Sequence, residues 1–152
     1  MVVGKIHHHL AKFLSEIIMS LISGVHHVAL IVSDIERAKG FYINVLGLSL
    51  LDEHYRAERD SWKVDVALPD GRQLELFSFP GSPKRPSYPE AQGLRHLAFQ
   101  CVDVEQGVKQ LEQQGVACEP IRIDPYTSRR FTFFNDPDGL PLELYEVTVD
   151  EV

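Results

Sequence analysis

His27-Val28-Ala29-Leu30-Ile31-Val32-Ser33-Asp34-Ile35-Glu36 opens a stretch of this chain that recurs, with the same polar landmarks, 69 residues further on. The second copy reads His96-Leu97-Ala98-Phe99-Gln100-Cys101-Val102-Asp103-Val104-Glu105. Each copy ends on a Pro-Asp-Gly turn and a Leu-Glu-Leu segment, and the two glutamates are 68 residues apart. An internal repeat at a nearly constant offset predicts two structural modules of the same kind. The closing segments are 69–71 with 74–76, and 137–139 with 142–144.

Each copy has the pattern of a strand, a helix and three further strands. In the first, an apolar, β-branched run precedes Asp34, a residue type that caps helix N-termini, and helical spacing continues to Gly47. In the second, Asp103 and Gly115 occupy the corresponding places. The order βαβββ is therefore predicted twice, with strands at about 25–32, 48–56, 61–68, 73–79, 95–102, 117–123, 129–134 and 142–147.

The chain has 152 residues, which is enough for one domain with a substantial core. We expect an N-terminal extension over 1–22, whose apolar residues have helical spacing, and a single domain over 23–149. That domain divides into a module over 23–80, a linker rich in proline and glycine over 81–93, and a module over 94–149. The predicted fold class is α+β: two tandem βαβββ modules that form a cupped mixed sheet with the helices on the outside.

Charge and composition narrow the kinds of partner. The formal net charge of −7 lacks the basic surface that nucleic acids or anionic membranes require. No apolar run approaches the roughly 20 residues that span a bilayer. Cys101 and Cys118 lie in apolar, strand-like segments and are expected to be buried free thiols, as in a reducing cytoplasm. A cytoplasmic protein with a small-molecule partner is therefore favoured.

Each copy of the repeat keeps one histidine and one glutamate, and these are the candidate metal ligands. Side chains alternate along a strand, so each candidate lies opposite an apolar face that suits the cover of a helix. Imidazole nitrogens and carboxylate oxygens suit Ni, Zn, Co, Mn or Fe(II). We expect two half-sites that combine to hold one divalent metal ion per site. The four residues are His27, Glu75, His96 and Glu143.

Each of these residues taken alone has an ordinary structural explanation. A single histidine or glutamate on a strand is more often a satisfied or solvent-facing side chain than a ligand. Four such residues at corresponding places in two repeats favour the metal site instead. The repeat also distinguishes His27 from its neighbour His26, because His96 aligns with His27 and is preceded by Arg95.

These residues carry a resemblance to a known family. From about Val25 to Glu146 the chain resembles the vicinal oxygen chelate superfamily, which includes glyoxalase I, bleomycin-resistance proteins and extradiol dioxygenases. The resemblance implies paired modules around a divalent metal, a homodimer, and metal ligands at the four positions named above. Three segments look most like a small bacterial glyoxalase-like group: Tyr55-Arg56-Ala57-Glu58-Arg59-Asp60-Ser61-Trp62-Lys63, Glu75-Leu76-Phe77-Ser78-Phe79-Pro80 and Arg130-Phe131-Thr132-Phe133-Phe134-Asn135-Asp136-Pro137-Asp138-Gly139.

The residue at position 75 indicates which chemistry the resemblance implies. A glutamate there is similar to glyoxalase I, the lyase that joins glutathione and methylglyoxal into lactoylglutathione. Related methylmalonyl-CoA epimerases typically carry glutamine, and extradiol dioxygenases use two histidines and one glutamate, so proton transfer is favoured over oxygen activation. Bacterial glyoxalase I holds glutathione with an arginine four residues after its first histidine and an asparagine four after its first glutamate. This chain has Ile31 and Phe79 there, which departs from that form of glutathione recognition.

The leading hypothesis is a divalent-metal-dependent lyase or isomerase, similar to lactoylglutathione lyase, that acts on a small substrate with two neighbouring oxygens. The metal would stabilise an enediolate, and Glu143 or Glu75 would be the base, with Glu143 favoured by the resemblance. Two alternatives are a non-catalytic binding or resistance module and a metal-dependent dioxygenase. Whether one chain or two supply the four ligands stays open.

An anionic substrate would need cationic contacts and a stacking face. The candidates for this role are Arg56, Arg59, Trp62, Arg129 and Arg130, together with Lys84 and Arg85 of the linker.

Overall fold

The structure is a computed structural model that describes residues 20–152. The predicted helical extension over 1–22 therefore lies almost wholly outside the described residues, and 20–22 belong to no helix or strand. Within 20–152, every helix is too short or too polar to cross a bilayer.

The first module is a four-stranded mixed sheet with one helix. The sheet order is β1-β4-β3-β2, in which β1 runs parallel to β4 and the other neighbours are antiparallel. A 3₁₀ turn, η2, closes the hairpin between β2 and β3. The elements are β1 (His27–Val32), α2 (Ile35–Lys39), the π-helical turn η1 (Gly40–Val45), β2 (Ser49–Arg56), η2 (Ala57–Arg59), β3 (Ser61–Ala67) and β4 (Gln73–Ser78).

The second module repeats this arrangement with the order β5-β8-β7-β6 and a parallel pair of β5 and β8. A final 3₁₀ turn, η3, ends the chain. The elements are β5 (Leu97–Cys101), α3 (Val104–Gln113), β6 (Arg122–Ile123), β7 (Arg130–Asn135), β8 (Pro141–Glu146) and η3 (Val149–Glu151).

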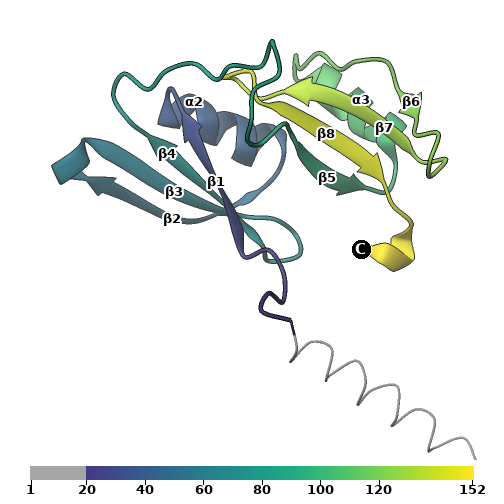
Figure 1. The fold of residues 1–152 in the computed structure, drawn as a ribbon, viewed down its shortest axis with the longest axis horizontal. Helices are drawn as coiled ribbons and strands as arrows, with labels where there is room; N and C mark the ends of the chain where they lie inside the picture. Colours follow the sequence, from purple (N-terminus) through teal and green to yellow (C-terminus); the bar gives the residue numbers. More distant parts are fainter. Residues whose placement is uncertain (1–19) are drawn as a thin grey trace, which may run out of the picture.

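The prediction of two βαβββ modules is confirmed. In Figure 1 the two sheets stand as separate lobes, and the linker crosses between them at the top of the view. Each lobe has its own hydrogen-bonded sheet of four strands, so the cupped sheet of the prediction takes the form of two sheets within one chain.

The first helix and the strand expected at about 117–123 differ in part from the prediction. The start of the helix is as predicted, since Oδ1 of Asp34 caps α2 by accepting a hydrogen bond from the Arg37 amide at 2.9 Å. After Lys39, however, the helix widens into the π-helical turn, where the Leu46 amide donates to the Phe41 carbonyl at 3.0 Å. The strand expected at about 117–123 shrinks to β6, because Pro120 has no amide hydrogen for a ladder.

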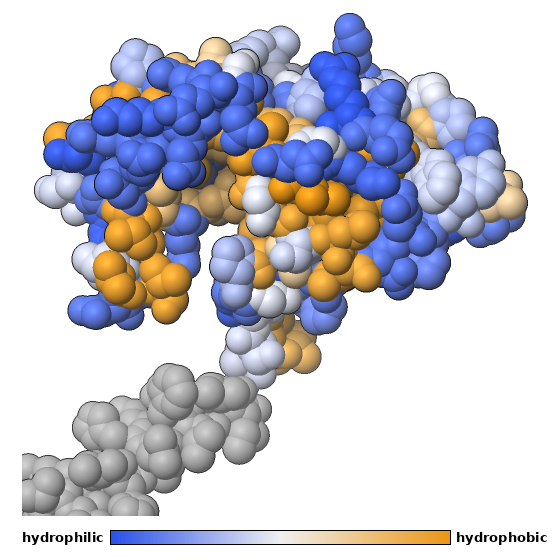
Figure 2. All heavy atoms as spheres, turned by 180° about the vertical axis from the view of Figure 1, so that it is seen from behind, coloured by the Kyte–Doolittle hydropathy of each residue, from blue (hydrophilic) through white to orange (hydrophobic). Residues whose placement is uncertain are grey.

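One hydrophobic core joins the two modules. It contains the apolar sides of β3 and β4 and the side chains of α2 and η1, and it continues into Phe134 of β7 and Leu142 of β8. Phe41 of η1 contacts Phe134, with ring centroids 6.4 Å apart. The sheet faces that carry Leu74 and Leu142 are thus turned toward the shared core. Seen from behind, the two lobes flank a hollow beside which hydrophobic side chains gather on the surface (Figure 2).

A buried hydrogen bond also ties the modules together. The Tyr42 hydroxyl donates to Oδ2 of Asp136 at 2.8 Å, and Oδ1 of Asp136 accepts from the amides of Asp138 and Leu140. Tyr42 is fully buried, and this burial together with the charge of Asp136 raises the pKa of Tyr42 well above its usual range. The tyrosine is therefore a permanent donor that helps to fix the Pro-Asp-Gly turn of the second module against the first.

Replacing this tyrosine tests the connection. Tyr42→Phe leaves Oδ2 of the buried Asp136 without its donor, and we expect the free energy of unfolding to fall by about 1–3 kcal/mol. Tyr88→Phe is the matched control because Tyr88 is 82% exposed, and its effect should stay within about 0.5 kcal/mol. Urea unfolding followed by circular dichroism measures both values. Equal stabilities of the two variants would contradict a structural role for this hydrogen bond.

Candidate metal site

The first predicted pair of ligands comes together across the parallel strands β1 and β4. Ala29 is the register partner of Glu75, and His27 starts β1 two residues earlier. Nε2 of His27 and Oε2 of Glu75 are 2.8 Å apart, and the imidazole is more exposed than the carboxylate. Nδ1 of His27 lies 2.9 Å from Nδ1 of His26, so His26 contacts the far side of the ring. The structure thus brings His27 and Glu75 together as a pair.

The second pair has the same arrangement on β5 and β8. Nε2 of His96 lies 2.9 Å from Oε2 of Glu143, although His96 itself stands one residue before the first residue of β5. Glu143 is 7% exposed and is the more enclosed of the two glutamates. The edge of Phe133 meets the His96 ring with centroids 5.0 Å apart. The internal repeat therefore extends to the relative positions of the donor atoms.

Within one chain the two pairs stay apart. Across residues 20–152, no group of three or more histidine, cysteine or acidic side chains is close enough to hold one metal ion. The reason lies in the fold: side chains alternate along a strand, so Glu75 lies opposite Leu74 and Leu76, which are buried in the shared core. Glu143 similarly lies opposite Leu142. We call the sides that carry the His–Glu pairs the ligand faces; they point away from the shared core.

The donor atoms of each pair suit a divalent ion. Histidine nitrogens and carboxylate oxygens bind such metals at roughly 2.0–2.2 Å, so two ligands at a right angle stand roughly 3 Å apart. The separations of 2.8 and 2.9 Å match this value. A charge-assisted hydrogen bond has a similar length, so the case for a metal rests on the donor types and on the repetition of the pair. Two pairs together supply four ligands, which leaves two positions of an octahedral ion for substrate oxygens.

The two glutamates differ in their surroundings. Nζ of Lys63 lies 3.1 Å from Oε1 of Glu75 and also contacts Asp65. The hydrogen bonds to Asp65 and to Glu75 raise the pKa of Lys63, so its charge balances that of Glu75. Among the described residues, Glu143 has His96 as its one basic partner, and the aromatic rings of Phe133 and Tyr145 lie on its face of the sheet. Glu143 is therefore the carboxylate whose charge is less compensated.

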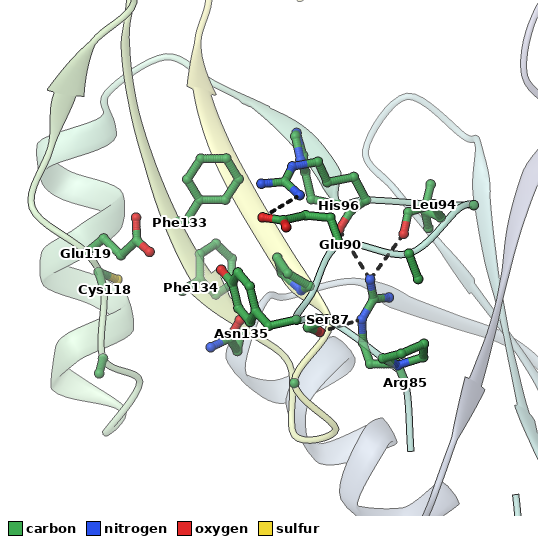
Figure 3. Close-up of a pocket in the computed structure, with 18 of the residues that line it drawn as sticks. Arg85, Ser87, Glu90, Leu94, His96, Cys118, Glu119, Phe133, Phe134 and Asn135 are labelled. Atoms are coloured by element: carbon green, nitrogen blue, oxygen red, sulfur yellow. Dashed lines mark hydrogen bonds and ion pairs between the residues drawn. The ribbon is translucent and has the colours of Figure 1, made fainter. Parts of the chain in front are cut away.

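A cavity of about 810 Å³ opens beside the second pair. The linker segment from Arg85 to Arg95 lines one side of it, with His96 next to Glu90 and Leu94, and Phe133 and Phe134 line the other side (Figure 3). The Arg85 guanidinium donates to Ser87 Oγ at 3.0 Å and to the Leu94 carbonyl at 3.1 Å, which shapes the linker side. The volume is in the range of pockets that enclose small molecules.

Two of the predicted substrate-binding residues lie on the ligand face of the first sheet. Arg56 is the last residue of β2, and its Cζ lies 5.0 Å from the centroid of Phe77. Arg59 in η2 lies over Phe79 at 4.7 Å. Glu75, Phe77 and Phe79 point to the same side of β4 and its extension, so both arginines share a face with the first His–Glu pair.

The other predicted contacts are placed elsewhere. Trp62 points to the same side of β3 as the buried Val64 and Val66, which is the core side of the first sheet. Its ring packs against that of Tyr55, with centroids 5.2 Å apart. Arg129 binds Glu151 of the C-terminal turn. Arg130 contacts Glu105 of α3 at 2.6 Å, on the side of the second sheet that the helix covers. The linker residue Arg85 is engaged with the linker itself, and Lys84 makes no ion pair among the described residues.

Lys63, Phe77 and Phe133 were not singled out from the sequence. The alternation of side chains along a strand could have indicated them. Lys63 points to the same side of β3 as Asp65, which is the register partner of Glu75, and Phe133 is the register partner of Glu143.

Cys101 and Cys118 are free and partly buried, and burial raises the pKa of both thiols, which favours the uncharged form.

Comparison with known proteins gives a family match over most of the chain. The family model described as "Glyoxalase/Bleomycin resistance protein/Dioxygenase superfamily" matches residues 24–144. The chain is 60% identical over 122 residues to the uncharacterized protein YaeR of Escherichia coli (strain K12), covering 80% of this chain and 95% of that protein. It is 30% identical over 141 residues to a 2-epi-5-epi-valiolone epimerase of an Actinomyces species, covering 79% of this chain and 77% of the epimerase.

The fold has a counterpart among solved structures. The crystal structure of a glyoxalase family protein from Enterococcus faecalis superposes with a TM-score of 0.79 at 45% identity. The match covers 84% of this chain and all of that one. The residues that the family model matches, 24–144, include both His–Glu pairs.

Proposed function

Because the chain belongs to the glyoxalase/bleomycin resistance protein/dioxygenase superfamily, we propose that it is a divalent-metal-dependent lyase or isomerase, similar to lactoylglutathione lyase, for a small substrate with two neighbouring oxygens. The observation that carries this proposal is the repeated His–Glu pair, with donor separations of 2.8 and 2.9 Å in the two modules. When bound, a divalent ion would act as a Lewis acid that acidifies the C–H beside the chelated oxygens.

We further propose that two copies of the chain complete the site. Each ligand face carries two ligands and points away from the core of its own chain. A twofold homodimer would let the first pair of one copy meet the second pair of the other, giving two equivalent four-ligand centres. Apolar side chains left on the surface support such pairing; Ile31, which shares the ligand face with His27, is 63% exposed.

The chain's own residues divide the remaining work. His27, Glu75, His96 and Glu143 would hold the ion before substrate binds, and the ion pair with Lys63 would hold the Glu75 carboxylate in place. Glu143 would take the proton from the substrate carbon and return it to the neighbouring carbon, because its charge is less compensated than that of Glu75 and aromatic rings limit its contact with water. The cavity beside His96 would receive the substrate.

Metal content provides the test of the site. The full chain, with His7, His8 and His9 replaced by alanine to remove adventitious ligands, should hold close to one divalent ion per chain after reconstitution. His27→Ala or His96→Ala should lower this below about 0.1 ion, because three ligands at most remain. His26→Ala is the matched control and should retain the ion. Plasma mass spectrometry of dialysed protein measures the content; an unchanged content in His96→Ala would reject the assignment.

A further inference from the structure

We infer that Arg56 and Arg59 form a subsite for an anionic group of the substrate, either a carboxylate or a phosphoryl group. This inference rests on the proposed function, since it names the substrate class of the same site. The substrate would then have two neighbouring oxygens at one end for the metal and a negative charge at the other.

The two arginines reach the ligand face from the hairpin between β2 and β3. The Arg56 guanidinium lies 5.0 Å from the Phe77 centroid and 5.7 Å from the Phe79 centroid, and the two rings are nearly parallel. Arg59 lies over Phe79 at 4.7 Å. A guanidinium stacked on an aromatic ring keeps its N–H groups in its own plane, where they can bind the oxygens of an anion.

These two arginines differ from the rest of the chain in their partners. The sequence has nine arginines, and seven of them bind a carboxylate or a backbone carbonyl in the structure. Arg59 makes neither a hydrogen bond nor an ion pair within 20–152, although the chain has 22 acidic residues. Arg56 donates only to the Ser61 hydroxyl, at 3.0 Å.

The Arg56 side chain has a further unmet requirement. Its Nε is the one buried side-chain nitrogen or oxygen without a hydrogen-bond partner among the described residues. Native proteins satisfy nearly all such groups, and exceptions often mark functional places. The guanidinium is held in position by Ser61 and the two rings, whereas its charge is left uncompensated.

The neighbouring charged groups do not already fill this role. Oδ1 of Asp60 accepts a hydrogen bond from the Tyr55 hydroxyl at 2.5 Å, and Tyr55 packs on Trp62, which lies on the core side of the sheet. Lys63 is paired with Asp65 and Glu75. The arginine pair is therefore the cationic group that stays available on this face.

The distance along β4 sets the size of the substrate. Phe77 and Phe79 follow Glu75 by two and four residues, which corresponds to roughly 7 and 13 Å of strand. An anion at Arg56 would thus lie several covalent bonds from oxygens chelated beside Glu75. A small hydroxy or oxo acid with an anionic tail has this form.

Three probe molecules distinguish binding of the anionic group, which we call the tail, from binding of the two neighbouring oxygens to the metal. Glycerate carries the neighbouring oxygens alone, 2-hydroxyadipate adds a carboxylate at the far end of a longer chain, and 3-phosphoglycerate adds a phosphoryl group. Isothermal titration calorimetry would measure their Kd for the metal-loaded full chain and for Arg56→Gln, Arg59→Gln and the charge-matched control Lys109→Gln, in which the exposed helix residue Lys109 is replaced. Inorganic phosphate would be titrated into metal-free samples of the same proteins.

The expected result is that one of the two tails tightens binding at least about tenfold over glycerate, and that each arginine variant removes this gain while glycerate affinity is kept. Lys109→Gln should behave as wild type. Which tail gains affinity decides between carboxylate and phosphoryl. Equal binding of all three probes, or a tail gain that survives both arginine variants, would overturn the inference. If no metal binds, the proposed function fails, and the phosphate titration then decides on the anion subsite. Phosphate binding that both arginine variants weaken would uphold the subsite. Absence of phosphate binding, or phosphate binding that neither arginine variant weakens, would overturn it.

Discussion

A mixture of two variants, each lacking one His–Glu pair, is expected to regain about a quarter of the wild-type metal content, although neither variant binds the ion alone. One variant is His27→Ala with Glu75→Ala, and the other is His96→Ala with Glu143→Ala. In a twofold dimer with shared centres, a mixed dimer combines the intact first pair of one copy with the intact second pair of the other. Its second centre loses all four ligands. Half of the dimers in a random mixture are mixed, which gives one intact centre in four.

The experiment needs chains that exchange. The two variants would be denatured together, refolded and dialysed against metal, and plasma mass spectrometry would give ions per chain. Each variant refolded alone is the control and should hold no more than trace metal. A mixture that stays empty despite forming mixed dimers would contradict the shared centre, because centres built within one chain cannot be restored by mixing.

Glu143→Gln should separate proton transfer from metal binding. Glutamine keeps a carbonyl oxygen that can ligate the ion but has no carboxylate to accept a proton, so we expect the metal content to be kept and the rate of proton transfer to fall about 10²- to 10⁴-fold. The measurement is the loss of the C–H signal of a methylglyoxal hemithioacetal in D₂O, followed by proton NMR. The hemithioacetal would be formed with glutathione and with a small thiol in parallel.

Glu75→Gln is the matched control for this assignment. Lys63 already balances the charge of Glu75 at 3.1 Å, so Glu75 is expected to act as a ligand, and its replacement should slow exchange less than that of Glu143. If Glu75→Gln proved the more damaging of the two at equal metal content, the roles of the glutamates would be reversed. Equal rates for wild type and Glu143→Gln would exclude Glu143 as the base.

Much of the fold could be predicted from the repeat. The alternation of apolar and polar residues indicated β1, β4, β5 and β8, and Asp34 and Asp103 cap their helices as expected. The π-helical turn after Lys39 was not predictable, because the apolar spacing is similar in α- and π-helical turns while the hydrogen-bond pattern is set by packing.

The candidate site was predictable in its parts and not in its assembly. Periodicity assigns a side chain to a face, so the pairing of His27 with Glu75 and of His96 with Glu143 could be expected from sequence. The separation of the two pairs depends on how the modules pack, which the tertiary contacts of Phe41 and Tyr42 decide. Trp62 and Arg130 were predicted to bind substrate from their residue types alone. In the structure their side chains lie on the sides of the two sheets that face the core and the helices.

The family itself leaves the reaction open, because one scaffold hosts several chemistries. The match over 24–144 fixes the fold, and the 30% identical relative is an epimerase by name. The discriminating features are local: two complete His–Glu pairs, a carboxylate with few compensating charges at position 143, and two arginines without acidic partners. A binding module would need the cavity but would not need a proton-accepting carboxylate at position 143.

The most direct test of the central claim is a crystal structure of the metal-loaded protein with anomalous data collected at the absorption edge of the bound metal. The account predicts one ion per chain, bound by His27 and Glu75 of one copy and by His96 and Glu143 of the other. Anomalous density bound by a single pair, or by residues outside these four, would contradict it.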